Sequence, residues 1–247
     1  MALQEAFEKQ GNWLFKRRSY LPISIVFVGG GWYILSLYFN KVSVHEWWVD
    51  FLFLCVGFLG LGIRILTVGF TPKGTSGRNT GKGQIAEQLN TAGIYSMVRH
   101  PLYLGNFFMW LVPVLLLSDF WFTMFFCAFY WIYYERIMYA EEQFLRKKFG
   151  EVFLEWANRT PAFFPKFSLY KKSDLQFSFK NVLKREYNGF FGLVFTVTMF
   201  RMVGFGVSTE KLYLDKPWII IFSMALFIFL ALKVIKKFTR FLDVAGR

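Results

Sequence analysis

Charged side chains are scarce in this sequence: they make up 18% of its 247 residues, whereas 55% are hydrophobic. A soluble domain carries about 25% charged residues, so the composition argues against one. Six apolar runs approach the roughly 20 residues that a helix needs to cross a bilayer, although the third run is shorter. They span residues 21–39, 47–67, 103–117, 120–139, 190–207 and 217–235. The sequence therefore predicts an all-α, multi-pass membrane protein with about six transmembrane helices, and residues 1–247 form a single integral membrane domain.

Acidic residues are scarcer than basic ones, with 16 Asp and Glu against 29 Lys and Arg, and the formal net charge is +13. With six crossings, 23 of the 29 cations fall on one side of the membrane and three on the other. Cytoplasmic loops carry such an excess. We therefore expect the termini and both long basic segments in the cytoplasm, with the protein in a bacterial inner membrane. The charge also attracts anionic lipid, and it does not indicate nucleic acid because no basic soluble domain is present.

Cysteine and histidine are also rare, at two residues each. Cys55 and Cys127 lie inside apolar runs, and two such cysteines provide neither a disulfide framework nor a metal cluster. His45 and His100 fall on opposite predicted faces of the membrane, so a shared zinc ion is excluded. Neither a G-x-S-x-G motif nor a Ser-His-Asp set is evident. We expect no metal site.

Several local patterns predict helices outside the simple spans. The link "LSDF" between the third and fourth runs is so short that these runs must form a helical hairpin. An N-terminal helix lying on the membrane is predicted by one shared face of Leu3, Phe7 and Leu14. An amphipathic helix continuing out of the fourth run, and ending near Pro161, is predicted from aromatic residues at roughly helical spacing. These are Phe144, Phe149, Phe153 and Trp156.

The stretch "VRHPLYLGN" at 98–106 places polar residues at the start of the third apolar run. Pro101 suits the first turn of a helix, which places His100 at the N-cap. Gly105 would permit close approach of a ligand or of another backbone. A helix N-terminus at the membrane surface favours anionic groups. By spacing alone, a capped helix start with a snorkelling Arg99 explains the stretch equally well.

Ionisable residues inside the apolar runs are costly, and each is a functional candidate. Arg64, Arg136 and Glu141 lie near the cytoplasmic ends of runs, where snorkelling to the interface is the alternative. Arg201 lies within the fifth run, and pairing with a lipid phosphate is one alternative for it.

The loop "PKGTSGRNTGKG" before the third run is rich in glycine but does not match a Walker loop. Ser76 stands where the motif requires glycine, and Gly83 follows the lysine. Its cations, Lys73, Arg78 and Lys82, suit an anionic head group at the bilayer surface. A flexible loop is the alternative.

The stretch "GIYSMVRHPLYLGN" followed by "ERIMYAEEQFLRKKFG" and an aromatic, proline-rich end resembles the isoprenylcysteine carboxyl methyltransferase and phospholipid methyltransferase family. The resemblance covers 64–165, which we expect to be the methyltransferase core; 166–247 would add an extra C-terminal pair of transmembrane helices. It implies a cytoplasm-facing pocket for S-adenosylmethionine. The branch that methylates lipid A phosphate in bacteria is one possible placement.

The resemblance also implies residue roles. Cofactor-binding residues would be His100, Tyr103, Gly105, Arg136, Glu141, Pro161 and Pro165. Arg64 would position the acceptor, and Glu142 is the second acid of its pair. Lys73, Arg78 and Lys82 would help to bind substrate.

An anionic acceptor is ionised at pH 7 and needs alignment rather than a base, whereas an amine acceptor would require Glu142 or His100 as the base. The surplus of cations favours an anionic acceptor, first a lipid phosphate such as that of lipid A. The alternatives are an isoprenylcysteine carboxylate, a phosphatidylethanolamine nitrogen, a sterol-reductase-like enzyme using NADPH, and a lipid-binding or channel-like protein without activity. The sequence leaves the oligomeric state open.

Overall fold

A computed structural model of the chain describes residues 2–18, 21–39, 41–72, 74–75, 84 and 86–247. The described part contains eight α-helices and two short 3-10 helices, and it confirms the all-α prediction. The α-helices are α1 (Leu3–Arg17), α2 (Leu21–Tyr38), α3 (Trp47–Gly69), α4 (Pro101–Leu115), α5 (Phe120–Phe149), α6 (Glu151–Arg159), α7 (Phe179–Thr209) and α8 (Lys216–Phe238). The 3-10 helices are η1 (Ile94–Ser96) and η2 (Phe167–Leu169).

Three helices in the described part, α3, α7 and α8, are long and apolar enough to cross a membrane. Two shorter apolar helices cover 23–38 and 101–115 and match the first and third predicted runs. The fourth run lies in α5, whose last third carries the polar residues of the cytoplasmic segment. The protein is therefore an all-α membrane protein, and the count of six spans stays a prediction for α2, α4 and α5.

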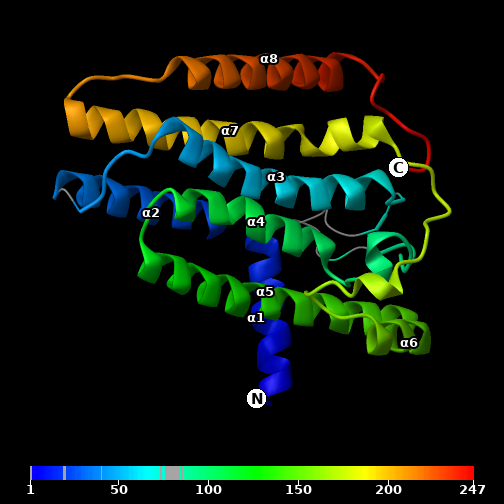
Figure 1. Cartoon of the computed structure of the whole chain (residues 1–247). Coiled ribbons are helices and arrows are strands. Elements are labelled where there is room, and N and C mark those ends of the chain that lie inside the picture. The colour runs from blue at the N-terminus through cyan, green and yellow to red at the C-terminus, as the bar shows by residue number, and fades with distance from the viewer. Residues whose placement is uncertain (1, 19–20, 40, 73, 76–83, 85) are drawn as a thin grey trace.

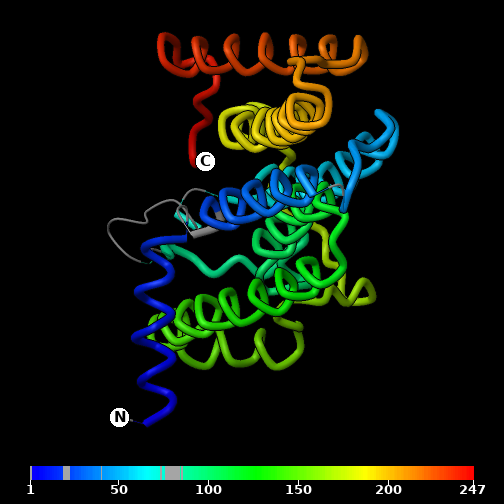
Figure 2. The backbone as a smooth tube through the Cα atoms, turned by 90° about the vertical axis from the view of Figure 1, so that its left-hand side faces the viewer, coloured from blue at the N-terminus to red at the C-terminus, as the bar shows by residue number. Residues whose placement is uncertain are grey.

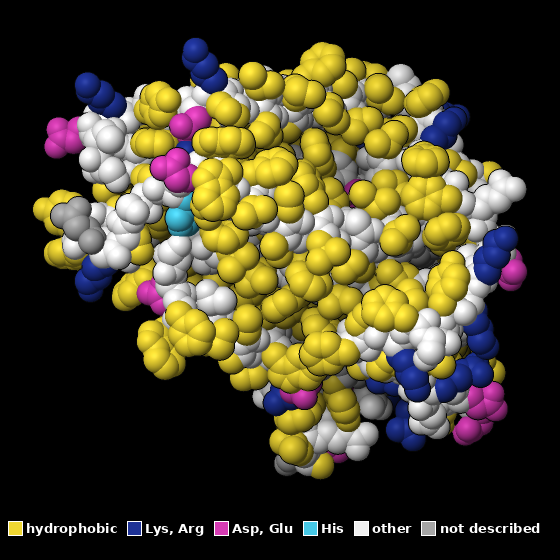
Figure 3. Space-filling model, viewed as in Figure 1, with side chains coloured by type: hydrophobic (Ala, Val, Ile, Leu, Met, Phe, Trp, Pro, Cys, Tyr) yellow, Lys and Arg dark blue, Asp and Glu magenta, His cyan; other side chains and the backbone are white. Residues whose placement is uncertain are grey.

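The helices are stacked in an order that both ribbon views show. From the top of Figure 1 downward, α8 covers α7, α7 packs on α3, α3 packs on α4, and α4 forms a hairpin with α5. Helix α1 runs across this stack and packs against α5, and its position along a membrane surface stays a prediction. In Figure 3, hydrophobic side chains cover most of the face, and Lys and Arg gather around the end where α5 meets α6.

Helices α3 and α4 approach closely because each of them has a glycine facing the other helix at the crossing. A β carbon on Gly60 of α3 would lie 2.4 Å from the carbonyl oxygen of Gly105 on α4. The surrounding core joins three helices through Leu54 on α3, Val112 on α4 and Val197 on α7. Helix α7 is thus part of the central packing, although it lies beyond the predicted core.

The predicted amphipathic helix after the fourth run is interrupted. Helix α5 ends at Phe149, Gly150 adopts φ 55°, and α6 then begins at Glu151. A positive φ is inexpensive for glycine and costly for other residues, so Gly150 allows the change of direction. The single continuous helix of the sequence prediction was wrong, but Phe153 and Trp156 are buried as their spacing indicated.

A buried ionic network lies at the end of the bundle away from α6. Arg201 of α7 contacts the carboxylates of Asp50 on α3 and Asp215 before α8, and it donates to the His45 carbonyl at 3.1 Å. Arg201 and Asp50 each expose only 2% of their side chains. The arginine therefore joins α7 to α3 and to the start of α8 within the protein, whereas the sequence left open a lipid phosphate as its partner.

Candidate functional site

The start of α4 is held by the segment that follows α6. The backbone N–H of Arg99 donates to the Pro161 carbonyl at 2.9 Å, and the N–H of His100 donates to the Ala162 carbonyl at 3.1 Å. Pro101 occupies the first turn of α4 with His100 at the N-cap, as predicted. The proline-rich segment therefore fixes the backbone of Arg99 and His100 through these two hydrogen bonds.

His100 stands between two neighbouring glutamates of α5. Its Nε2 atom lies 2.9 Å from Glu142 Oε1, and its Nδ1 atom lies 3.7 Å from Glu141 Oε2. Tyr103, one turn further along α4, donates its hydroxyl to the same Glu141 oxygen at 2.9 Å. The His100 and Tyr103 rings stack with centroids 5.6 Å apart and planes 17° apart. Four predicted site residues are thereby brought together.

Glu142 also interacts with Arg99. The arginine Nε atom lies 2.9 Å from Glu142 Oε1 as an ion pair, and its Nη1 atom donates to the Ala157 carbonyl at 2.5 Å. Burial by itself would raise the pKa of Glu142, but the hydrogen bond from His100 and the charges of His100 and Arg99 lower it below its ordinary value. Glu142 is therefore an ionised carboxylate whose Oε1 atom contacts both His100 and Arg99.

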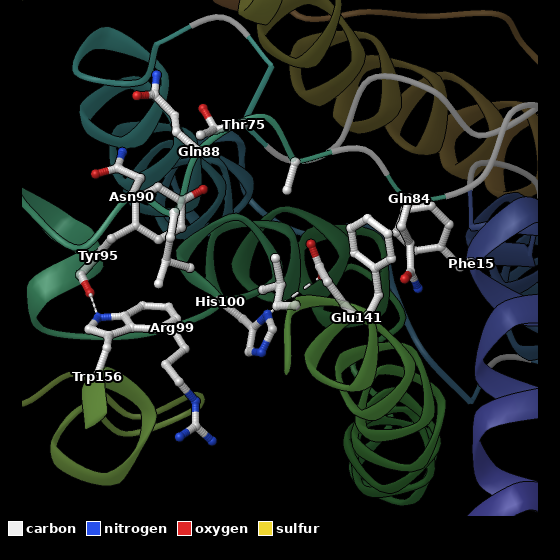
Figure 4. Close-up of a pocket in the computed structure, with 14 residues that line it drawn as sticks. Phe15, Thr75, Gln84, Gln88, Asn90, Tyr95, Arg99, His100, Glu141 and Trp156 are labelled. Carbon is white, nitrogen blue, oxygen red and sulfur yellow. Dashed lines mark hydrogen bonds and ion pairs between the residues drawn. The ribbon is translucent and has the colours of Figure 1, made fainter. Parts of the chain in front are cut away.

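A cavity of about 320 Å³ opens beside this cluster. Its walls include Arg18, Arg64, Arg99, Tyr103, Trp110 and Glu141. A smaller hollow of about 50 Å³ shares His100 and Glu141 with it and extends toward Phe15 and Trp156. In Figure 4 the side chains of His100 and Glu141 point toward one another, and Trp156 donates to the Tyr95 carbonyl at 3.2 Å. The cavity thus combines acids, cations and aromatic rings.

Arg64 forms the far wall of the cavity and is held from two sides. Its Nε and Nη2 atoms donate to the two oxygens of Glu186 at 2.7 and 2.9 Å, and its Nη1 atom donates to Asn106 at 2.6 Å. Its side chain is 22% exposed, against 5% for Glu186. Arg64, Asn106 and Trp110 also line a second cavity, of about 480 Å³, between α4 and α7. Arg64 therefore stands at the boundary of two cavities.

Sequence comparison finds a family model that is similar to part of this chain. A family model described as phospholipid methyltransferase matches residues 51–152, which include Arg64, His100, Tyr103, Glu141 and Glu142. Residues 51–152 are thus similar to this family. The matched region ends before the proline-rich segment and before α7, so Glu186 comes from outside it. No solved structure shows a significant match.

Curated relatives are similar over part of their lengths. A cobalt-zinc-cadmium resistance protein of Cupriavidus metallidurans is 33% identical over 138 residues, which are 56% of this chain and 61% of that protein. A nickel-cobalt-cadmium resistance protein of Alcaligenes xylosoxydans xylosoxydans is 32% identical, over 56% of this chain and 62% of its own length. A protein-S-isoprenylcysteine O-methyltransferase of Schizosaccharomyces pombe is 31% identical, over 44% of this chain and 48% of that enzyme. The chain thus spans about three fifths of the first two relatives.

Some predicted site residues of the methyltransferase region lie elsewhere. Arg136 pairs with Glu135 and packs over the ring of Phe7 on α1, with its guanidinium carbon 3.4 Å from the ring centroid. It points away from the His100 cavity, because five positions along a helix turn the side chain by about 140° relative to Glu141. Arg136 lines instead a separate apolar groove between α1 and α5.

Gly105 serves packing between helices rather than the wall of the cavity. A β carbon there would lie 2.6 Å from Arg64 Cγ and 2.7 Å from the Gly60 carbonyl oxygen. Pro161 contributes its carbonyl to the backbone of Arg99, and neither Pro161 nor Pro165 lines the cavities beside His100. The predicted substrate cations Lys73, Arg78 and Lys82 lie outside the described residues.

Sequence reasoning missed Asn106 and Glu186. Asn106 was the last residue of the quoted stretch at 98–106. Its polar amide near the start of an apolar run was a signal that could have identified it. Glu186 precedes the fifth apolar run and was counted with the cytoplasmic segment, but α7 begins at Phe179 and carries it into the bundle. Among the described residues, no group of His, Cys, Asp and Glu is arranged to hold a metal ion.

Proposed function

We propose that this protein is an integral membrane methyltransferase that uses S-adenosylmethionine and methylates an anionic lipid head group, first a lipid phosphate such as that of lipid A. The main observation behind this proposal is a pair of adjoining cavities that share Arg64, Asn106 and Trp110. One is polar and next to the family's His100 and Glu141, and the other lies between helices of the bundle. A water-soluble donor and a lipid acceptor require such a junction.

The residues around the polar cavity fit the proposed donor chemically. S-adenosylmethionine has an amino group and a sulfonium, both cationic, together with a carboxylate and an adenine ring. Glu141 offers an acceptor oxygen to a cation, Arg18 and Arg99 offer donors to a carboxylate, and Tyr95 offers a ring face. The volume of about 320 Å³ falls within the roughly 300–1,000 Å³ typical of small-molecule sites. Bound there, the cofactor would supply an activated methyl group.

The protein's own contribution to the reaction is alignment and exclusion of water. The acceptor oxygen would form the new O–C bond with its own electron pair, and the C–S bond of the donor would break with its electrons left on sulfur. Opposite charges are neutralised in this step, so a site without water favours it. Arg64 would orient the acceptor oxygen by charge-assisted hydrogen bonds. Holding both reactants in line can supply about 7–11 kcal/mol of the barrier.

The geometry supports an anionic acceptor over an amine. An amine would need a base, and the two candidates, Glu142 and His100, already bond to each other at 2.9 Å, with Arg99 on the same oxygen. An ionised phosphate or carboxylate needs no such base. An isoprenylcysteine carboxylate is the main alternative, because one relative is named as a protein-S-isoprenylcysteine O-methyltransferase. The cation excess at the His100 end supports a cytoplasmic position for the polar cavity.

The test has a binding arm and a transfer arm. Purified protein should bind S-adenosylhomocysteine, and Glu141→Gln and His100→Ala should weaken that binding at least tenfold, while Glu155→Gln on the exposed surface of α6 leaves it unchanged. Membranes incubated with methyl-labelled donor should yield label in a lipid phosphate. Binding of NADPH in place of S-adenosylhomocysteine, or parent-like binding by both variants, would reject the proposal.

A further inference from the structure

We propose that the cavity between α4 and α7 is the acceptor site, and that it holds a membrane lipid whose head group is a phosphate monoester. The inference rests on the proposed function and deepens it, because it assigns the acceptor to a helix outside the family region. The cavity measures about 480 Å³. Its walls include Met109, Trp110 and Pro113 from α4, and Asn188, Gly189 and Gly192 from α7.

One face of α7 builds its side of the cavity. Arg185, Asn188, Gly189, Gly192 and Thr196 all line it, and each of them lies three or four residues from another member of the set, which places them on one stripe of a helix. The stripe begins with Arg185 and Asn188, continues with two glycines and ends with the small side chain of Thr196. Such a stripe leaves a channel along the helix, because glycine adds no side chain to fill it.

Polarity falls along the cavity in the same direction on both walls. On α4 the order along the chain is Asn106, Met109 and Pro113; on α7 the charged Arg185 and Glu186 come first, and Leu193 and the uncharged Thr196 come last. Both helices begin at the end of the bundle where α6 lies, as Figure 1 shows. The polar end therefore faces the membrane surface and the apolar end lies deeper, which matches a lipid head group followed by its chains.

The polar end has a net positive charge for a phosphate, because it has two arginines and one carboxylate, that of Glu186. Arg64 and Arg185 both line it. Arg64 has five N–H donors, and the described hydrogen bonds use three of them, two for Glu186 and one for Asn106. The other two can be donated to a phosphate oxygen while the guanidinium stays in place. Glu186 is then a positioning residue that fixes Arg64 at the boundary of the two cavities.

Gly192 provides a direct test of the site. A β carbon at this position meets no described atom within 4 Å, so a larger side chain would enter the cavity instead of the helix packing. Gly192→Leu should fold normally, because leucine is a better helix former than glycine. Gly31→Leu on α2 is the matched control: Gly31 is exposed, and its added β carbon also meets no described atom within 4 Å.

The probe is a fluorescent phosphatidic acid, added to the full-length protein in detergent, with fluorescent phosphatidylcholine as comparison. The parent and Gly31→Leu should bind phosphatidic acid alike and more tightly than phosphatidylcholine. Gly192→Leu should bind it at least tenfold more weakly. S-adenosylhomocysteine should bind all three proteins with equal affinity, because its cavity does not include Gly192.

The outcomes separate this inference from the proposed function. Parent-like phosphatidic acid binding by Gly192→Leu, with S-adenosylhomocysteine still bound, would overturn the acceptor site and leave the methyltransferase proposal standing. Phosphatidic acid has a phosphate monoester, whereas the phosphate of phosphatidylcholine is a diester capped by choline. Equal affinity for the two lipids, or displacement of phosphatidic acid by a lower concentration of farnesylcysteine than of unlabelled phosphatidic acid, would overturn the assignment of a phosphate monoester. No S-adenosylhomocysteine binding by any protein would reject the proposed function itself.

Discussion

Arg64 on α3 and Glu186 on α7 form a two-point ion pair, with Nε and Nη2 donating to the two carboxylate oxygens at 2.7 and 2.9 Å. The two residues are 122 positions apart in sequence. Arginine matches a carboxylate in this paired geometry, which fixes the plane of the guanidinium as well as its position. The contact ties the family region to a helix beyond it, and it sets the direction in which Arg64 faces the two cavities.

Glu186→Gln keeps the size of the side chain and removes its charge. We expect the KM for the lipid acceptor to rise about tenfold, because a charge-assisted pair is replaced by a weaker neutral contact worth about 1.4 kcal/mol less. The affinity for S-adenosylhomocysteine should stay as in the parent. Steady-state kinetics with varied acceptor, alongside Glu155→Gln as control, check this. A fall in kcat with an unchanged KM would contradict a positioning role.

Gly105→Ala should separate α3 from α4, since the added β carbon would lie 2.6 Å from Arg64 Cγ and 2.7 Å from the Gly60 carbonyl oxygen. Overpacking of this kind costs about 1–3 kcal/mol of unfolding free energy. Gly62→Ala on α3 is the control, because its β carbon meets no described atom within 4 Å. Thermal unfolding in detergent should show a lower Tm for Gly105→Ala alone. Equal Tm values would show that the crossing tolerates a methyl group.

Glu142 should make stability depend on pH in the acid range. The hydrogen bond and charges from His100 and Arg99 outweigh burial and lower its pKa, so the folded value lies below the unfolded value of about 4.3. Its contribution is complete above the unfolded pKa and is lost as the pH falls through the folded pKa. Parent protein should exceed Glu142→Gln in Tm near neutral pH, and the difference should shrink below about pH 4. A Tm difference that does not change with pH would contradict the assignment of this pH dependence to Glu142.

Arg201→Met should destabilise the bundle without affecting the site. The substitution leaves Asp50 and Asp215 without their arginine, and breaking a buried pair in this way costs about 3–5 kcal/mol. Asp50 and Arg64 are fourteen residues apart on α3, which is about 21 Å along the helix. S-adenosylhomocysteine affinity, measured below the unfolding temperature, should therefore match the parent. Adding Asp50→Asn should restore part of the lost Tm, because it removes one of the two unpaired carboxylates. A further fall in Tm would show that these unpaired carboxylates do not cause the destabilisation.

The main helices and half of the site were predictable because their signals are local. The lengths of apolar runs indicated membrane helices, and a four-residue link required the α4–α5 hairpin. Pro101 marked the start of α4 because it fits the first helical turn. His100, Tyr103, Glu141 and Glu142 were predicted through the family pattern, and the structure brings all four together.

Other features depended on how the helices pack. The resemblance implied that Arg136 binds the cofactor together with Glu141, but the two side chains are about 140° apart around α5 and Arg136 packs over Phe7 on α1. From the sequence, Gly105 could permit close approach of a ligand or of another backbone. In the structure it is the backbone of Gly60 on α3 that lies close to it.

The sequence by itself determined the membrane helices, their hairpin and the residues at the start of α4, because apolar length and proline act within a few turns of one chain. The tertiary structure decided the partner of Arg64 and the place of the second cavity. Those depend on which face α7 turns toward α3 and α4, and that face is selected by packing among three helices that no local pattern encodes.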